Sequence, residues 1–461
     1  MKKKWGGISL LSKNVNLTEG PILSSMIVYA IPLVLSNILN TLYNAADVMV
    51  VGNFAGKEAV AAVGATTTII GLLVHVLPNI ATGFNIILAR AMGARDEAHI
   101  KRTISTAYVF SIVLGIIISA LGMVFARSLL EITDCPQNII DHSVLYMRIY
   151  MLGVPATVFY GFMSCILGIS GDTKRPFYYL AISGLLNIVT NIVLVLTTGE
   201  PVISVAIATV SSMWLSAILL FIRLVRIDGP CHLSPFNFHV NLPTLLKIIK
   251  LGIPASISVA SFSLTNLQIQ SAINSFGDIG TAGNTASITI ENFLFSVTNT
   301  AGTVLSAFIG QNIGAGNRER TLRIRRTGYA VFMSAATVMS TLCLIFGRSL
   351  LGLVIPGEYE AIDFGLMRLT CLASVSVIHA VITTNNGILQ AFGYTNFQMI
   401  INLVGTCGLR FVWTMFIFPL SPTAFSLYIC YPISYTFVMI MGLVMTVYLM
   451  RRYKQGESFS I

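Results

Sequence analysis

The sequence predicts an all-α integral membrane protein, in which twelve transmembrane helices form two six-helix lobes related by a pseudo-two-fold axis along the membrane normal. Three observations predict this fold class. The 461-residue chain is 55% hydrophobic and only 10% charged, whereas soluble domains are about one quarter charged. Apolar stretches of about 20 residues, long enough to cross a bilayer as a helix, recur from end to end. The two halves of the chain also resemble each other.

Each predicted helix is an apolar stretch bounded by glycine, proline, asparagine, aspartate or clustered charges, which are typical of helix ends. The helices of the first half are expected at 23–51, 59–89, 104–126, 138–166, 177–197 and 202–224. Those of the second half are expected at 246–275, 283–311, 328–347, 361–390, 397–418 and 425–449. The chain then divides into an N-terminal segment (1–22), an N-terminal lobe (23–224), a linker (225–245), a C-terminal lobe (246–449) and a tail (450–461).

Basic residues predict how the chain is oriented. If the N-terminus lies inside, 22 of the 28 lysines and arginines fall in or beside inner segments, while the outer loops are rich in aspartate and glutamate. By the positive-inside rule, both termini are then cytoplasmic. The net charge of +10 is explained by contact with anionic lipids, so membrane lipids are expected partners and nucleic acid is not. The seven cysteines lack a CxxC pair and predict neither disulfides nor a structural metal site.

Three short segments recur in the same order in both halves. "AIP" ending at Pro32 returns as "GIP" ending at Pro254, an offset of 222 residues. "MGARDEAHIKRTISTAY" from Met92 returns as "IGAGNRERTLRIRRTGY" from Ile313, and "YMR" returns as "LMR", at offsets of 221 and 220. Six helices per half predict parallel repeats around a central cavity. Pro32 and Pro254 interrupt the first helix of each half, where we expect a bend during conformational change, with an ordinary membrane kink as the alternative.

Two acidic residues, Asp47 and Glu291, fall well inside predicted helices. An intramembrane carboxylate is costly, so Asp47 is interpreted as a proton or cation site, with a structural ion pair as the alternative. Asn44 precedes it on the same face. Asn187 and Asn191 are one helical turn apart on the fifth helix, at a depth similar to that of Asp47. The asparagines could contact the ion or form interhelical hydrogen bonds.

The second half does not repeat this arrangement. Asp47 corresponds to Gln268 or its neighbour, and the seventh helix carries Gln268 and Gln270 but no acid. Glu291 and Arg410 lie at comparable depth in the eighth and eleventh helices, which predicts a buried ion pair, with substrate contact in a cavity as the alternative. His379 on the tenth helix is a candidate proton relay or a hydrogen-bonded packing residue.

The motifs "LYNAADVMVVGNFAGKEAVAAVG", "GARDEAHIKR" with its echo "GAGNRERTLRIRR", and "GISGDTKRPFYY" resemble the multidrug and toxic compound extrusion (MATE) family, most closely its bacterial branch. The resemblance covers nearly the entire chain. It implies two lobes forming a V, alternating access, and export of cationic or amphipathic small molecules against inward flow of protons or sodium. It implies a bacterial inner-membrane location and no cofactor beyond the coupling ion, and we expect a monomer.

The resemblance also assigns roles to single residues. Asp47 matches a coupling aspartate on the first helix of the family. The family's fifth-helix pattern of Asn, three residues and Asp begins at Asn187 but has Asn191 in place of the acid. Asp47 is then the only carboxylate of its half-site. Sodium-coupled members carry acids on the seventh and tenth helices, and the absence of an acid deep in either helix here favours protons over sodium, although sodium at Asp47 stays open.

Two other functions are weighed against export. An enzyme is not expected, because the sequence has no HExxH, no GxSxG, no paired carboxylates on one helix and no phosphate-binding glycine loop. A flippase for lipid-linked saccharides, or for another amphipathic lipid, is the alternative within transport. A flippase would favour a more basic cavity, whereas the deep charges here are Asp47, Glu291 and Arg410, so the sequence favours cations.

Overall fold

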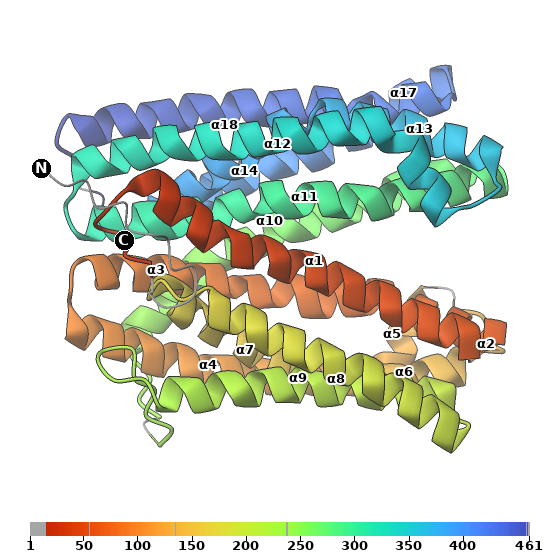
Figure 1. The fold of residues 1–461 in the computed structure, drawn as a ribbon, viewed down its shortest axis with the longest axis horizontal. Coiled ribbons are helices and arrows are strands. Elements are labelled where there is room, and N and C mark those ends of the chain that lie inside the picture. The colour runs from red at the N-terminus through yellow and green to blue at the C-terminus, as the bar shows by residue number, and fades with distance from the viewer. Residues whose placement is uncertain (1–14, 55, 134, 237, 458, 460–461) are drawn as a thin grey trace, which may run out of the picture.

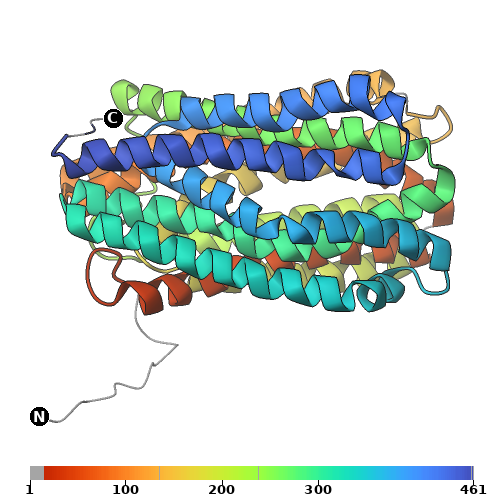
Figure 2. The same cartoon turned by 90° about the horizontal axis from the view of Figure 1, so that it is seen from above.

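The computed structural model describes residues 15–54, 56–133, 135–236, 238–457 and 459; the side chains at 44–61, 68, 72, 75, 77, 78 and 267 lie outside that description. The first half of the chain forms one lobe and the second half another, with the long helices running roughly along one axis (Figure 1). Seen from above, the helices of the second half lie side by side along this axis (Figure 2). The architecture is therefore a two-lobed helical bundle.

The N-terminal lobe contains six membrane-spanning units. They are α1 (Ile22–Phe54), α2 (Gly56–Gly71) continuing through η1 (Leu72–Val76) and η2 (Leu77–Ile80) into α3 (Ala81–Gly93), α4 (Glu97–Val124), α6 (Ile140–Met151) with α7 (Val154–Ile169), α8 (Lys174–Thr198) and α9 (Pro201–Val225). The short helix α5 (Ala126–Ile132) connects α4 to α6.

The C-terminal lobe repeats this order. Its units are α10 (Leu242–Asn274), α11 (Gly277–Gly314), α12 (Arg318–Val354), and α13 (Tyr359–Ser374) with α14 (Ser376–Ala391). The fifth unit runs through α15 (Thr395–Asn402), η3 (Leu403–Gly408), α16 (Leu409–Val412), η4 (Trp413–Ile417) and η5 (Phe418–Leu420). The sixth is α17 (Ala424–Tyr428) with α18 (Cys430–Lys454).

These units confirm the predicted twelve helices in two lobes. Within the described residues, nine spans are long and apolar enough to cross a membrane, and the α6–α7 and α13–α14 pairs add two more that bend by 40° and 49°. The α2–α3 unit is the twelfth. The two bent pairs occupy the fourth place in each lobe, as parallel repeats require. Pro32 and Pro254, where bends were predicted, lie inside the single helices α1 and α10.

The repeated motif that begins at Met92 and Ile313 forms the same turn in both lobes. Arg95 and Gly316 adopt left-handed backbone conformations, with φ of 57° and 68°. The next residue in each copy caps the following helix: the side chain of Asp96 accepts a hydrogen bond from the backbone N–H of His99, and Asn317 does so at the start of α12. Aspartate and asparagine are favoured at this position because they satisfy free N–H groups of the first helical turn.

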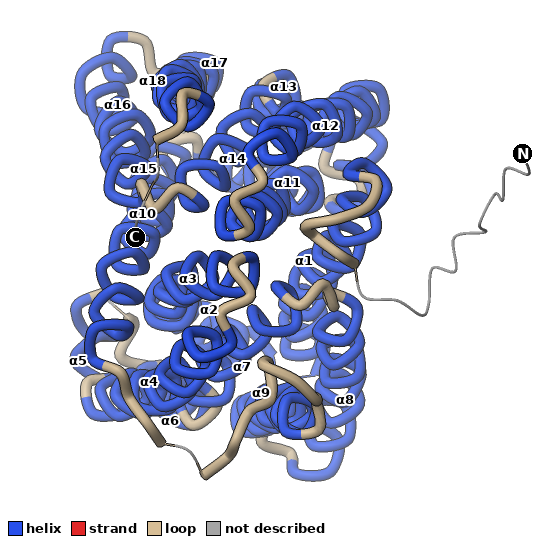
Figure 3. The backbone as a smooth tube through the Cα atoms, turned by 90° about the vertical axis from the view of Figure 1, so that its left-hand side faces the viewer, coloured by secondary structure: helices blue, strands red, loops and turns tan. Residues whose placement is uncertain are grey.

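The two lobes meet at one end of the bundle, where α3 packs against α10 and α11 (Figure 3). Glycine permits this approach. A Cβ on Gly93 would lie 1.9 Å from the carbonyl oxygen of Gln311, and a Cβ on Gly314 would lie 2.1 Å from that of Arg90. The two contacts are repeats of each other, since 314 − 93 and 311 − 90 both equal 221. We call this region the closed end.

Side-chain hydrogen bonds also cross the closed end in matched pairs. The Arg90 guanidinium donates to the carbonyl oxygen of Ala391 at 3.1 and 2.8 Å. The Gln311 amide donates to the carbonyl oxygen of Ile169 at 2.5 Å. Ala391 and Ile169 end the matching helices α14 and α7, so each lobe reaches the same place on the other. The pseudo-two-fold axis therefore passes through the closed end.

Candidate functional site

A polar cavity of about 600 Å³ lies between the lobes. Its walls come mainly from α1, η2, α10, α11, α14, the α15–η3 unit and α18. No aspartate, glutamate, lysine or arginine occurs among its described lining residues. Amide side chains dominate its polar surface, contributed by Asn37, Asn40, Asn79, Asn292, Asn299, Asn386, Gln398 and Asn402. The cavity can therefore both donate and accept hydrogen bonds without a net charge.

Hydrogen bonds hold part of this amide wall in place. The Asn37 amide of α1 donates to the Ser296 carbonyl oxygen at 3.4 Å and to the Thr300 hydroxyl at 3.3 Å, both on α11. These bonds join the two lobes at the wall of the cavity. The Asn402 amide donates to the Ser258 hydroxyl at 2.7 Å. The wall is thus positioned by the protein and not only by solvent.

The predicted coupling residues Asn44 and Asp47 belong to the helical backbone of α1, and their side chains lie outside the described part of the structure. Asn187 and Asn191 are buried on α8, and the Asn191 amide donates to the Asn187 side-chain oxygen at 3.2 Å. α8 packs beside α1, and the Tyr43 hydroxyl donates to a carbonyl oxygen of α8 at 3.0 Å. The two helices predicted to share a polar cluster are therefore neighbours.

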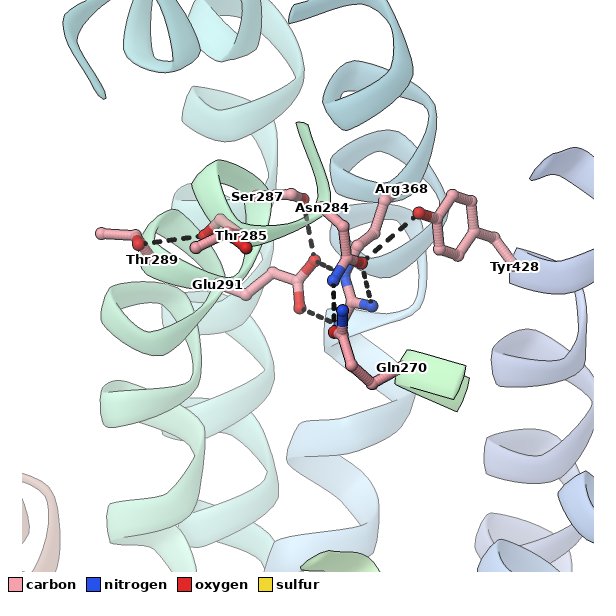
Figure 4. A network of polar contacts seen from close by, with 8 residues as sticks. All are labelled: Gln270, Asn284, Thr285, Ser287, Thr289, Glu291, Arg368 and Tyr428. Carbon is pink, nitrogen blue, oxygen red and sulfur yellow. Dashed lines mark hydrogen bonds and ion pairs between the residues drawn. The ribbon is translucent and has the colours of Figure 1, made fainter. Parts of the chain in front are cut away.

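Glu291 forms a buried ion pair with Arg368 rather than the predicted Arg410. The Arg368 Nε donates to Glu291 Oε1 at 2.7 Å and its Nη2 donates to Oε2 at 2.9 Å, a bidentate arrangement (Figure 4). Arg368 lies on α13, which packs directly against α11. Depth along the membrane alone favoured Arg410, but the helix that faces Glu291 is α13. The expected ion pair exists with a different partner.

Neighbouring polar groups complete this ion-pair network. Arg368 Nη1 donates to the Asn284 side-chain oxygen at 2.8 Å, and the Asn284 amide donates to Gln270 Oε1 at 3.0 Å (Figure 4). The side chains of Arg368 and Glu291 are only 6% and 4% exposed. No member of the network is among the described residues that line the cavity. We therefore assign it to the packing of the C-terminal lobe.

The other predicted polar residues divide between lobe packing and the cavity. Gln268 donates to the Thr414 hydroxyl at 2.7 Å and is not a described lining residue. His379 does line the cavity. Its Nδ1 lies 2.8 Å from the Thr298 hydroxyl oxygen, and its ring packs on Phe295 with 4.6 Å between ring centroids. His379 thus has the hydrogen bond of a packing residue and the position a relay would need.

Arg410 is completely buried and lies in α16, a four-residue helical stretch between the π-helical segments η3 and η4. Its Nε donates to the Ser434 hydroxyl at 2.8 Å. Its guanidinium carbon lies 4.1 Å from the ring centroid of Tyr431 and 4.8 Å from that of Tyr435. π-helical turns change the face that a residue presents. The depth of Arg410 along its helix therefore did not show whether its side chain faces Glu291.

None of the asparagines in the described cavity wall was predicted from the sequence, because the interpretation concentrated on charged residues. A signal was present. Asn37 and Asn40 are three residues apart, and Asn292 and Asn299 are seven apart, so each pair shares one helical face. Amides repeated on one face of an apolar helix indicate either a helix interface or a polar cavity.

Across the part of the chain that the structure describes, no group of three or more histidine, cysteine, aspartate or glutamate side chains is arranged to hold a metal ion. All seven cysteines are free thiols. The polar chemistry available at the described cavity wall is therefore that of amides, hydroxyls and one histidine.

Twelve membrane-spanning helices in two repeated lobes, with a polar cavity between them, define a multi-pass membrane protein with the architecture of a transporter. The MatE family model matches residues 32–193 and 254–416, one match in each half. The chain belongs to the MatE family. The matches begin at Pro32 and Pro254, 222 residues apart, which is the offset of the repeat found in the sequence.

Relatives and solved structures agree with this assignment. "Probable multidrug resistance protein YoeA" of Bacillus subtilis is 28% identical over 341 residues, covering 72% of this chain and 74% of that protein. "Probable multidrug resistance protein YpnP" of the same organism is 26% identical over 408 residues, covering 87% and 90%. The solved structure described as "Outward-facing conformation of a multidrug resistance MATE family transporter of the MOP superfamily" has a TM-score of 0.87 at 21% identity, covering 96% and 99%. This structural likeness concerns the fold.

Proposed function

We propose that this protein is a secondary active antiporter that exports amphipathic or cationic drugs and other toxic small molecules by alternating access. The observation that carries the proposal is a polar cavity between two repeated lobes that are held together at one end. A binding site at the interface of repeats can be exposed to either side of the membrane when the lobes rock against each other. The names of the relatives, which include multidrug resistance proteins, support export of drugs.

Asp47 is proposed as the coupling residue, with Asn44, Asn187 and Asn191 as its polar neighbours. Burial favours the protonated acid, whereas an approaching cation favours the carboxylate, so a proton and a cationic substrate compete for Asp47. Protonation from outside then favours release of the substrate, and deprotonation toward the cytoplasm restores binding. The membrane potential adds about 2.3 kcal/mol per inward elementary charge per 100 mV. Protons are preferred to sodium because the seventh and tenth helices carry no deep acid.

The membrane setting follows from the same reasoning. We place the protein in the bacterial inner membrane as a monomer surrounded by lipid, with both termini cytoplasmic because the basic residues gather there. The closed end carries the repeated basic motifs that follow Met92 and Ile313, so it faces the cytoplasm in this proposal. Pro32 and Pro254 are the positions where the first helix of each lobe would bend. The flippase alternative is not favoured, since the reported relatives are described as multidrug resistance proteins.

The proposal predicts that Asp47→Asn abolishes proton-driven drug transport. We would measure ethidium uptake into inverted membrane vesicles under an imposed proton gradient, acid inside, and separately under a sodium gradient. The native protein should concentrate ethidium with the proton gradient and not with the sodium gradient. Uptake by the variant should fall to the level of vesicles that lack the protein, because an amide at this position cannot take up and release a proton.

Asp141→Asn is the matched control for this experiment. It makes the same carboxylate-to-amide change at a surface side chain that is 81% exposed and pairs with Arg127. This control should transport like the native protein. Proton-driven uptake by Asp47→Asn at the native rate would remove Asp47 from the mechanism, and a lack of transport under both gradients would contradict drug antiport itself. Ethidium uptake under the sodium gradient but not under the proton gradient would identify sodium as the coupling ion.

A further inference from the structure

Arg410 is a buried cation without a counter-ion in the described part of the structure. Its exposed fraction is 0%, and none of the nine ion pairs found among the described residues includes it. Both carboxylate oxygens of Glu291 are already occupied by Arg368. A buried unpaired charge is expensive, so it calls for a ligand or another function that offsets the cost.

The contacts of the guanidinium leave one edge available. Ser434 accepts from Nε, and the aromatic rings of Tyr431 and Tyr435 lie against the group. Nη1 and Nη2 make no hydrogen bond of full geometry to a described residue, and the nearest polar group to the guanidinium besides Ser434 is the Tyr435 hydroxyl. These two nitrogens present parallel N–H donors, the arrangement that binds both oxygens of a carboxylate. The protein therefore holds the group in position and pairs its carboxylate-binding edge with no acid among the described residues.

The Arg410 guanidinium lies directly behind the cavity wall. Phe262 and Tyr435 both line the cavity, and their ring centroids are 6.0 and 4.8 Å from the guanidinium carbon of Arg410. The Tyr435 hydroxyl and the side-chain oxygen of Gln398, another lining residue, also have no hydrogen-bond partner among the described residues. A rotation of the Tyr435 side chain would connect Arg410 to the cavity. No acidic side chain among the described lining residues would repel an anion there.

We propose that Arg410 and Tyr435 form a carboxylate-binding subsite in the C-terminal lobe. The ligand class is an amphipathic molecule with an aromatic body, which packs on Phe262, and a carboxylate, which pairs with Nη1 and Nη2. The π-helical segments on both sides of Arg410 agree with this assignment, because such segments are frequent at functional sites. The subsite rests on the proposed export of small molecules and adds to it a preference, among those substrates, for compounds that carry a carboxylate.

Two dyes with the same chromophore test the subsite. Rhodamine 19 carries a free carboxylate, and rhodamine 6G is its ethyl ester. We would measure the binding of each to the purified full-length protein in lipid nanodiscs by fluorescence anisotropy, in chloride-free buffer. Rhodamine 19 should bind about tenfold more tightly or better, the value expected for hydrogen bonds to a charged group. Equal affinities in the native protein would overturn the proposal without any variant.

Variants test whether Arg410 causes the preference for rhodamine 19 over rhodamine 6G. Arg410→Gln should bring the affinity ratio of the two dyes to about one while binding of rhodamine 6G changes little. Its melting temperature without dye should be no lower than that of the native protein, because the variant loses an unpaired charge; a purely structural arginine would give a lower value. Arg348→Gln, at an exposed arginine, is the control and should keep the native ratio. A preference for rhodamine 19 that survives in Arg410→Gln would overturn the assignment.

A chloride titration separates a substrate subsite from a site for inorganic anions. If Arg410 serves substrates, 100 mM chloride should leave the preference for rhodamine 19 in place. Loss of the preference at that concentration would show an inorganic anion site and contradict the substrate class. The binding of the two dyes also separates the carboxylate subsite from the proposed export of drugs. Binding of rhodamine 6G without a preference for rhodamine 19 leaves drug export standing, whereas a failure of both dyes to bind argues against drug export as well.

Discussion

Glu291→Gln will lower the melting temperature of the purified protein by roughly 6–10 °C. Removing one partner of a buried ion pair costs about 3–5 kcal/mol, and each kcal/mol shifts the melting temperature of a large domain by about 2 °C. The variant leaves the Arg368 guanidinium buried in the C-terminal lobe with no carboxylate. Unfolding can be followed with a thiol-reactive fluorescent dye, because the buried free cysteines Cys343 and Cys430 become accessible when this lobe opens.

Two further variants show that the pair itself is responsible. Arg348→Gln breaks an ion pair with Asp363 at the surface, where the two side chains are 62% and 59% exposed. This variant should lose at most about 1 kcal/mol of folding stability. Replacing Glu291 and Arg368 together by methionine should recover most of the lost stability, because apolar residues often replace a buried ion pair at little cost. A double variant as unstable as Glu291→Gln would contradict this account.

Gly93→Ala will shift the protein away from the form in which the lobes meet. The new Cβ would lie 1.9 Å from the backbone oxygen of Gln311, so α3 and α11 must separate by about 1 Å or more. Overpacking of this kind costs about 1–3 kcal/mol, which changes the ratio between the closed and open forms by roughly 5- to 150-fold. Drug transport should fall accordingly, since one state of the cycle becomes poorly populated.

The shift can be measured as a distance. Spin labels at Lys101 and Arg326, exposed positions on α4 and α12 near the closed end, report the separation of the lobes in a cysteine-free background. Gly93→Ala should move the distance distribution to longer values. Gly161→Ala is the control, because a Cβ at Gly161 meets no atom within 4 Å. An unchanged distribution in Gly93→Ala would show that the glycine contact does not set the spacing of the lobes.

Much of the fold could be predicted from the sequence, because the membrane imposes simple requirements. A span of about 20 apolar residues has few alternatives to a helix, and an internal repeat at offsets near 221 restricts the arrangement of the two halves. The repeated turn at Arg95 and Gly316 is visible as a recurring motif. The close approach at Gly93 was not predicted, since a glycine in a helix does not by itself identify the helix that packs on it.

The candidate site was less predictable. Depth along the membrane can be counted from the sequence, but the direction in which a side chain points depends on helix rotation. Glu291 was therefore assigned to Arg410 instead of Arg368, and the π-helical segments around Arg410 made its direction still harder to predict. Charges are conspicuous in an apolar sequence, whereas the amides of the cavity are significant only where several helices bring them together.

The matched contacts at the closed end also bear on the kinetics of the protein. Gly93 on Gln311 and Gly314 on Arg90 are copies of one contact, placed on either side of the pseudo-two-fold axis. Rocking one lobe away from the other strains both copies together, so neither can be released early to make the second release easier. If the lobes open as proposed, we therefore expect opening to be cooperative, with a single barrier and no half-open intermediate. A single-molecule recording of the distance between the lobes should jump between two values instead of drifting. Weakening either glycine contact should shorten the time that the molecule spends at the shorter distance.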